Sequence, residues 1–141
     1  MAIFYHIDHA AGISLVVFDG LVTNDEYVAH THELAANPEW PAGRKLHLTD
    51  LTTMTNPGLL ADQTVVEMAS VWGAQRERFS GLKIAIVANG AFAKARRFER
   101  ALTPQGPTLI VFNLLSTACA WLDVDLRDTA HTLQRMRSGK C

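Results

Sequence analysis

Six histidines are the residues in this sequence that most readily suggest metal binding or acid–base chemistry. They are His6, His9, His30, His32, His47 and His131. Zinc sites bring His or Cys ligands together, commonly as two histidines four residues apart on a helix or as Cys-x-x-Cys pairs. His30 and His32 are two residues apart on a predicted helix and point away from each other, and the sequence has no Cys-x-x-Cys pair. We therefore expect no metal site and no cofactor, and we expect His47 to be a hydrogen-bonded residue of the core or its margin.

The sequence also lacks a recognisable nucleophile for covalent catalysis. It has no Gly-x-Ser-x-Gly turn, the motif that exposes a serine between a strand and a helix. Cys119 lies in the apolar run from Ala118 to Leu122, and a cysteine in such surroundings usually acts as inert filler. We therefore expect that the protein is not an enzyme.

A polar loop at residues 50–56 is the first candidate binding site. It follows a predicted strand and precedes a predicted helix, where open α/β sheets place ligands and where free helix amides attract anions. The residues that would contact a ligand or partner there are Asp50, Thr52, Thr53, Thr55 and Asn56. In the alternative interpretation, Thr55 or Asn56 only caps the helix and Asp50 accepts hydrogen bonds from loop amides. We favour this alternative, because the loop lacks a glycine pattern typical of phosphate binding.

A basic helix is the second candidate. It carries Lys94, Arg96, Arg97 and Arg100. Lys94 and Arg97 share one face by their spacing of three residues, and with the amides after Asn89-Gly90 they could hold a phosphate or an acidic partner. The alternative is a solvated face opposite the apolar stripe of Phe98, which we favour because such charges on an exposed helix are common.

Large apolar side chains could line a cavity for an apolar ligand. The candidates are Met68, Trp72, Phe79, Phe98 and Trp121. Side chains at helical spacing more often belong to the core, so we favour a core role for them.

The elements that must position these residues follow from apolar periodicity and turn residues. Predicted strands cover residues 3–8, 13–19, 46–51, 82–88 and 108–112. The first predicted helix starts at a capping box, residues 23–26, and ends at about residue 37. The second is long, starts at Asn56-Pro57 and buries Phe79. Three more helices are predicted at about 91–102, from a Ser116 cap to residue 122, and from about residue 126 onward.

The order of these elements predicts the fold class. The short link between the first two strands predicts an antiparallel hairpin, and strand and helix alternate from the second strand onward. Right-handed crossovers then give a parallel sheet. We expect an α/β fold with a mixed, mostly parallel five-stranded sheet, an antiparallel N-terminal edge strand and flanking helices.

Length, charge and cysteine content limit the classes of protein. The chain has 141 residues, which fits a single domain over residues 1–141. The formal net charge of −1 gives no basic face for nucleic acid, so we expect no nucleic-acid partner. Two cysteines in unlike settings, Cys119 and Cys141, indicate a reducing compartment. The N-terminus does not read as a signal peptide and the apolar runs are short for a membrane span, so we expect a cytoplasmic protein not integral to a membrane.

Several short segments carry a family resemblance. They are the run from Gly20 to Glu26 after an apolar strand, Leu48-Thr49-Asp50-Leu51, the strand from Lys83 to Val87 followed by a basic helix, and the closing run from Ala118 to Leu122. With the element order, they resemble the STAS fold of anti-sigma-factor antagonists and sulphate-transporter cytoplasmic domains, and more closely its stand-alone SpoIIAA-like branch.

The resemblance implies a regulatory or protein-binding module. Regulatory STAS proteins carry a phosphorylatable Ser or Thr after the third strand, where this sequence keeps Gly58-Leu59 but has Asn56-Pro57 in place of a serine pair. A phosphorylated residue would therefore be Thr52, Thr53 or Thr55. The alternative function, also drawn from the resemblance, is a carrier of a small apolar or anionic ligand between the 50–56 loop and the adjoining helices.

The last predicted helix suggests self-association. It has a thin apolar side made by Leu126, Ala130, Leu133 and Met136, and it follows a fold that is complete by residue 122. Such a helix must cover its own sheet or a second copy of the chain. Since two-fold dimers are the commonest oligomers, we expect a homodimer or another protein partner.

Overall fold

The computed structural model describes residues 2–41, 43–75 and 77–139. Its main sheet has five strands in the order β1-β2-β4-β6-β7. These are β1 (Ile3–Asp8), β2 (Ile13–Phe18), β4 (Leu46–Asp50), β6 (Lys83–Val87) and β7 (Thr108–Phe112). β1 is antiparallel to β2, and the other neighbouring strands are parallel. The predicted mixed sheet with an antiparallel N-terminal edge strand is confirmed.

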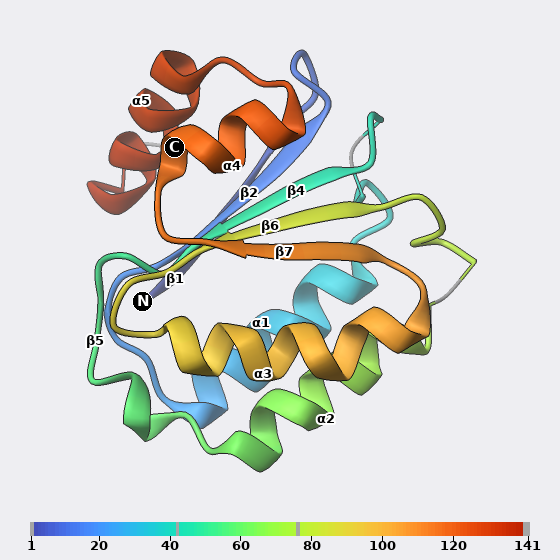
Figure 1. Cartoon of the computed structure of the whole chain (residues 1–141), viewed down its shortest axis with the longest axis vertical. Coiled ribbons are helices and arrows are strands. Elements are labelled where there is room, and N and C mark those ends of the chain that lie inside the picture. The colour runs from blue at the N-terminus through green and yellow to red at the C-terminus, as the bar shows by residue number, and fades with distance from the viewer. Residues whose placement is uncertain (1, 42, 76, 140–141) are drawn as a thin grey trace.

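Helices cover both faces of this sheet (Figure 1). One face carries α1 (Asn24–Ala36), α2 (Asp62–Gly73) and α3 (Phe92–Leu102). The other face carries α4 (Leu115–Leu122) and α5 (Leu126–Arg137). Because successive side chains of a strand point to opposite faces, each central strand supplies two cores. In β6, for example, Ile84 and Ile86 pack toward α1–α3, while Ala85 and Val87 pack toward α4 and α5.

The N-terminus of α1 is formed by the predicted capping box. The Thr23 hydroxyl accepts a hydrogen bond from the Glu26 amide at 3.2 Å, and the Glu26 carboxylate accepts one from the Thr23 amide at 3.2 Å. The hydrogen bond from the Thr23 amide is the main reason that the pKa of Glu26 is lowered. The box satisfies two amides that the helix itself leaves unpaired. It therefore fixes where α1 begins.

The long second helix predicted from Asn56-Pro57 is wrong at both ends. Pro57–Leu59 form one 3-10 turn, η1, and α2 begins only at Asp62. Asn56 has a left-handed backbone with φ of 49° and makes no side-chain cap. The preceding residues form a short strand, β5 (Met54–Thr55), paired with β3 (Gly20–Leu21), so tertiary pairing diverts the chain before the helix can start.

The same helix ends earlier than its apolar pattern indicates. α2 stops at Gly73, and glycine is a poor helix former. Phe79 lies beyond the helix, yet its side chain is buried in the same core. An apolar residue at helical spacing can thus reach a core from the turn that follows the helix.

The cap predicted for the fourth helix is also wrong. Ser116 lies inside α4, whose N-cap is Leu114 and has no side-chain cap bond. In contrast, α5 begins at Leu126 as expected, and Asp125 caps it by accepting a hydrogen bond from the Asp128 amide at 2.8 Å.

The last helix covers its own sheet. Leu133 and Met136 are fully buried in a cluster with β2, β4, β6 and α4, whereas Leu126 is 44% exposed. Leu133 therefore belongs to the core of its own chain, and the interpretation of this apolar side as a dimer surface is wrong for Leu133. No helix in the described ranges is both long and apolar enough to cross a membrane.

Candidate functional site

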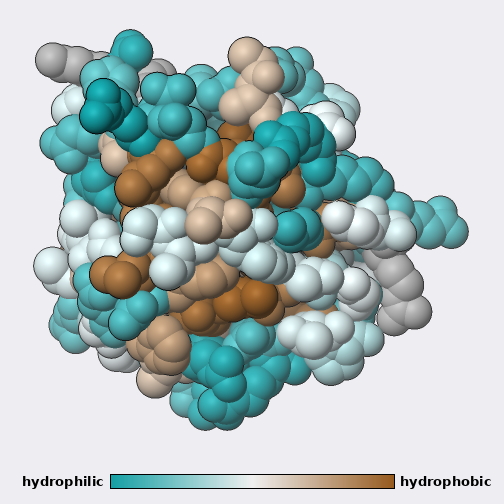
Figure 2. All heavy atoms as spheres, turned by 45° about the horizontal axis from the view of Figure 1, so that its top comes forward, coloured by the Kyte–Doolittle hydropathy of each residue, from teal (hydrophilic) through white to brown (hydrophobic). Residues whose placement is uncertain are grey.

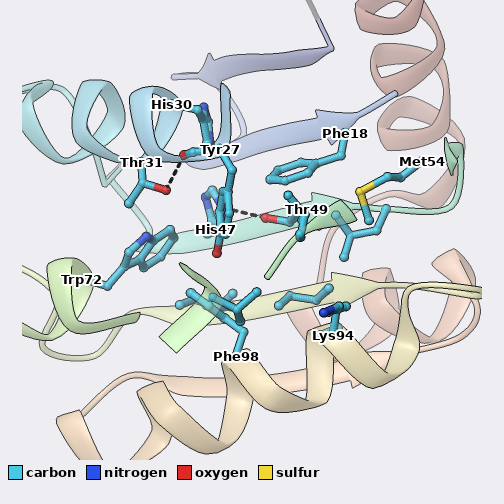
Figure 3. A pocket seen from close by; sticks show the side chains of 16 residues that line it. Phe18, Tyr27, His30, Thr31, His47, Thr49, Met54, Trp72, Lys94 and Phe98 are labelled. Carbon is cyan, nitrogen blue, oxygen red and sulfur yellow. Dashed lines mark hydrogen bonds between the residues drawn. The ribbon is translucent and has the colours of Figure 1, made fainter. Parts of the chain in front are cut away.

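A small pocket lies between the sheet and helices α1, α2 and α3 (Figure 3). Its volume is about 60 Å³. Apolar side chains make most of its wall, including Phe18, Met54, Leu60, Val65, Trp72 and Phe98. A site for one water molecule needs only about 10–15 Å³ on this kind of measure. The pocket therefore has room for a few waters or for a small organic group.

Polar side chains from three elements also reach this pocket. β4 contributes His47 and Thr49, which face the same side because they are two residues apart on a strand. α1 contributes Tyr27, His30 and Thr31 from adjacent turns of one face, and α3 contributes Lys94. In Figure 3 the side chains of α1 lie above, Lys94 of α3 lies below, and His47 and Thr49 lie between them.

His47 is the most deeply buried of these groups. Its Nδ1 atom lies 2.7 Å from the Ser14 hydroxyl and 3.3 Å from the Trp40 indole nitrogen, and its Nε2 atom lies 3.0 Å from the Thr49 hydroxyl. Burial, assisted by the neighbouring His30, lowers the pKa of His47 to about 3. The imidazole is therefore neutral and hydrogen-bonded at both nitrogens, as the sequence predicted for a core histidine.

His30 and Tyr27 are held neutral by their surroundings. Burial lowers the pKa of His30 to about 4, and its ring meets that of Phe18 edge-on at 5.9 Å. Burial also raises the pKa of the Tyr27 phenol. Among the described residues, the Tyr27 hydroxyl has no hydrogen-bond partner, while the nearby Thr31 hydroxyl donates to the Tyr27 main-chain oxygen at 2.9 Å. Tyr27 thus brings a free polar group into an apolar pocket.

Positive charge meets the pocket at α3. The Lys94 ammonium lies 2.6 Å from the Asp62 carboxylate, and the Arg97 guanidinium lies 3.4 Å from the same carboxylate. The Lys94 hydrogen bond is the main reason that the pKa of Asp62 is lowered. Lys94 lines the pocket and is 22% exposed, so it stands where the pocket meets solvent. The predicted pairing of Lys94 and Arg97 on one face is confirmed, but Asp62 already engages both.

The rest of the basic helix lies away from the pocket. Arg96 pairs with Glu99 at 2.7 Å on the exposed surface of α3, and Arg100 is exposed. This agrees with the interpretation of a solvated charged face opposite Phe98.

The polar residues of the 50–56 loop do not enter the pocket. Asp50 points to the opposite face of the sheet, where its carboxylate pairs with Arg137 of α5 and accepts from the Thr52 amide at 2.8 Å. Thr53, Thr55 and Asn56 are exposed. The loop instead sends its apolar residues Leu51 and Met54 into the pocket. The prediction that Asp50 accepts from loop amides is confirmed, while capping of a helix by Thr55 or Asn56 is wrong.

A different residue organises the segment before α2. The Asn24 amide group of α1 donates to the Leu59 carbonyl at 3.1 Å and accepts from the Ala61 amide at 3.0 Å. These two bonds hold the end of η1 against the start of α1. They also position Leu60 and the first turn of α2 at the pocket wall.

Sequence reasoning missed the polar groups of the pocket. Tyr27 and Thr31 share one face of the first predicted helix by their spacing of four residues, and His47 lies in a predicted strand, but no local pattern links the three. The usable signal was a buried strand with polar residues at positions 47 and 49, because two polar side chains on one face of an interior strand need partners. Of the proposed cavity residues, Trp72 and Phe98 line the pocket and also belong to the core.

Three further observations bear on function. In the described ranges, no three His, Cys, Asp or Glu side chains are grouped so that they could hold a metal ion. Exposed large apolar side chains include Leu21, Leu59, Val66, Phe92, Leu114 and Leu126. In the view of Figure 2, apolar side chains gather in two bands separated by paler residues.

Comparison with known proteins gives no relative. No protein-family model matches the chain, and no curated protein or solved structure matches it significantly. Function must therefore be argued from the geometry above.

Proposed function

We propose that the protein is a non-enzymatic binding module whose pocket takes a small ligand with an apolar body and a polar or anionic head. The single observation that carries this proposal is Tyr27, which lines an apolar pocket and whose hydroxyl has no partner among the described residues. A polar group without a protein partner at the wall of an apolar pocket is free to hydrogen-bond a ligand or water.

The size of the pocket limits the ligand. Sites for drug-sized molecules usually measure about 300–1,000 Å³. The present volume of about 60 Å³ suits a body of only a few carbon atoms. A long lipid chain would require α1 or α3 to move away from the sheet.

Charge at the pocket edge supports a polar or anionic head. Lys94 and Arg97 carry two positive charges against the single negative charge of Asp62. An anion at this edge would be stabilised by the remaining positive charge and by hydrogen bonds from the two unused N–H donors of the Lys94 ammonium.

This proposal draws on both functions that the sequence suggested. The carrier interpretation expects a ligand between the 50–56 loop and the adjoining helices, and it is supported by a pocket that Leu51 and Met54 line together with side chains of α1, α2 and α3. A regulatory role of the STAS type is compatible with it, if the bound ligand sets the affinity for a protein partner. We place this module in the cytoplasm, in keeping with its cysteine usage.

The test is a titration of the ¹⁵N-labelled protein with small probes, followed by NMR. The probes are five-carbon compounds with one polar group, and binding should shift the amides of pocket residues. Ala95→Leu should abolish these shifts, because Ala95 is buried and lines the pocket. Ala93→Leu is the matched control, since Ala93 is exposed on the same helix. If no probe shifts these amides in the unmodified protein, the proposal is wrong.

A second candidate function is protein binding at the free edge of the sheet. A groove of about 440 Å³ runs between β1 and α1, lined by residues that include Ile3, Tyr5, Glu26 and Glu33. β1 is an edge strand, and edge strands present unpaired backbone groups to which another chain can add. The occupant would be a second copy or another protein.

Light scattering coupled to size exclusion separates these two occupants. A homodimer should appear at concentrations of roughly tens of micromolar if a second copy fills the groove, since weak interfaces show at that scale. A monomer under these conditions would exclude the homodimer and leave a different protein as the partner.

A further inference from the structure

A chain of hydrogen bonds runs through the core toward the pocket. It starts at the indole of Trp40, passes through the Ser14 hydroxyl and the His47 ring, and ends at the Thr49 hydroxyl. Trp40, Ser14 and His47 are each at most 1% exposed, whereas Thr49 lines the pocket. The direction in which these bonds donate decides what Thr49 can offer to a ligand.

The first half of the chain has one consistent direction. The indole N–H of Trp40 can only donate, and it lies 2.8 Å from the Ser14 hydroxyl and 3.3 Å from His47 Nδ1. A proton on Nδ1 would face this N–H, so Nδ1 must be an acceptor. Ser14 then donates to Nδ1 at 2.7 Å in preference to the Leu46 carbonyl at 3.3 Å.

The second half follows from the neutrality of His47. A neutral imidazole with an accepting Nδ1 carries its proton on Nε2. Nε2 therefore donates to the Thr49 hydroxyl oxygen at 3.0 Å. The Thr49 hydrogen remains to be donated, and no acceptor for it is found in the described parts of the chain. Each bond in such a chain polarises the next, which strengthens Thr49 as a donor.

Two further donors reach the same pocket. The Tyr27 phenol keeps its hydrogen, because burial raises its pKa. The Lys94 ammonium donates one hydrogen bond to Asp62 and has further N–H groups that can donate to a ligand. The pocket thus gathers two hydroxyl donors inside and a cation at its edge, around an apolar wall.

We propose that the ligand is a small carboxylic acid, bound as its carboxylate, whose oxygens accept hydrogen bonds from Thr49 and Tyr27. This inference rests on the proposed function and names its ligand class. The branched or short alkyl body lies against Trp72 and Phe98, within the volume of about 60 Å³. The positive charge of Lys94 at the pocket edge favours a carboxylate over a neutral carbonyl, because it attracts a negative charge.

The experiment compares three probes of equal size by NMR titration: isovalerate, isovaleramide and isoamylamine. The carboxylate should bind best, the amide more weakly, and the amine at least about tenfold more weakly than the carboxylate, since its head can only donate. Inorganic phosphate, tested alone, should leave the pocket amides unshifted, because it has no apolar body.

Three variants locate the interaction. Thr49→Val replaces the hydroxyl with a methyl group of similar size, and Tyr27→Phe removes the hydroxyl, so each should weaken isovalerate binding by about tenfold. Thr117→Val is the matched control. Thr117 is exposed on α4, on the other side of the sheet, and its hydroxyl donates to the Leu114 carbonyl at 2.9 Å, so isovalerate affinity should not change.

The outcomes are separable. If isoamylamine binds as well as isovalerate, the carboxylate assignment is overturned while the binding function stands. If none of the three probes binds, both fail. If a variant does not fold, the inference can still be tested on the unmodified protein, where the ¹⁵N shifts of His47 should show the proton on Nε2. A proton on Nδ1 would reverse the direction of the hydrogen bonds and overturn the inference.

Discussion

The two faces of the sheet are built from the same strands but differ in chemistry. In β4, Leu46 and Leu48 face α4 and α5, while His47 and Thr49 face α1, α2 and α3. The α4–α5 face is packed by aliphatic side chains such as Leu133, and its buried carboxylate, Asp50, is paired with Arg137. The other face keeps a pocket, two neutral histidines and an unpaired phenol. One face therefore secures the fold, and the other holds the candidate binding site.

The largest expected effect is a charge placed in the packed face. Leu133→Asp should unfold the protein, because an unpaired carboxylate in an aliphatic core costs more than about 4 kcal/mol of a total stability of about 5–15 kcal/mol. Circular dichroism and chemical denaturation measure this. Leu126→Asp on the same helix is the control, and its exposed position should keep the change within about 0.5 kcal/mol. A folded Leu133→Asp protein would contradict the core position of Leu133, and its conversion from a dimeric unmodified protein to a monomer would make this helix a dimer surface.

The second effect belongs to the pocket face and depends on pH. His47 and His30 have pKa values of about 3 and about 4 in the folded protein, below the ordinary 6.5. As pH falls below 6.5, the unfolded chain takes up protons that the folded chain does not. Stability is thus fully present above this pH and decreases by about 1.4 kcal/mol per pH unit for each histidine.

Urea midpoints at pH 7, 6 and 5 measure this dependence. His47→Gln and His30→Gln should each flatten it, while His32→Gln, at an exposed position, should leave it unchanged. The lowered carboxyl pKa values of Glu26 and Asp62 act at lower pH, because the ordinary values of these groups are 4.5 and 3.8. A midpoint that stays constant from pH 7 to pH 5 would contradict the burial of both rings.

A third comparison inserts the same extra volume into each face. Ala118 is fully buried in the packed cluster, so Ala118→Leu should cost about 1–3 kcal/mol through overpacking. Ala95→Leu extends into the pocket and should cost less, since the space is already there. Thermal or chemical denaturation of the two proteins gives the difference. Equal losses would mean that the pocket has no spare volume.

The smallest effect tests whether each face depends on a helix cap. Thr23 caps α1 on the pocket face, and Asp125 caps α5 on the packed face. Thr23→Ala and Asp125→Ala should each cost about 1 kcal/mol, the usual loss for one side-chain cap. Similar shifts of the denaturation midpoint would show that both faces need their caps. An unchanged midpoint for Thr23→Ala would mean that the start of α1 is held by other contacts.

Local signals in the sequence predicted elements wherever neighbours along the chain decide the structure. The capping box at Thr23 and Glu26 needs only four consecutive residues. The strand predicted at residues 13–19 corresponds to β2, and all six residues of β2 are buried. Local signals were misleading at Asn56-Pro57, where pairing of β5 with β3, some thirty residues earlier in the chain, overrides the helix-start pattern.

The sequence by itself determined the α/β class, the mostly parallel sheet with an antiparallel N-terminal edge strand, and the buried face of α3, because these depend on periodicity and on the handedness of crossovers. Only the tertiary structure decided the site. The pocket is a gap between side chains of the sheet and of α1, α2 and α3. The direction of donation at Thr49 depends on Trp40 and Ser14, which meet His47 from separate parts of the chain. Likewise, Asp50 finds Arg137 across 87 positions. Gaps and long-range pairs arise from how whole elements fit together, which no local pattern encodes.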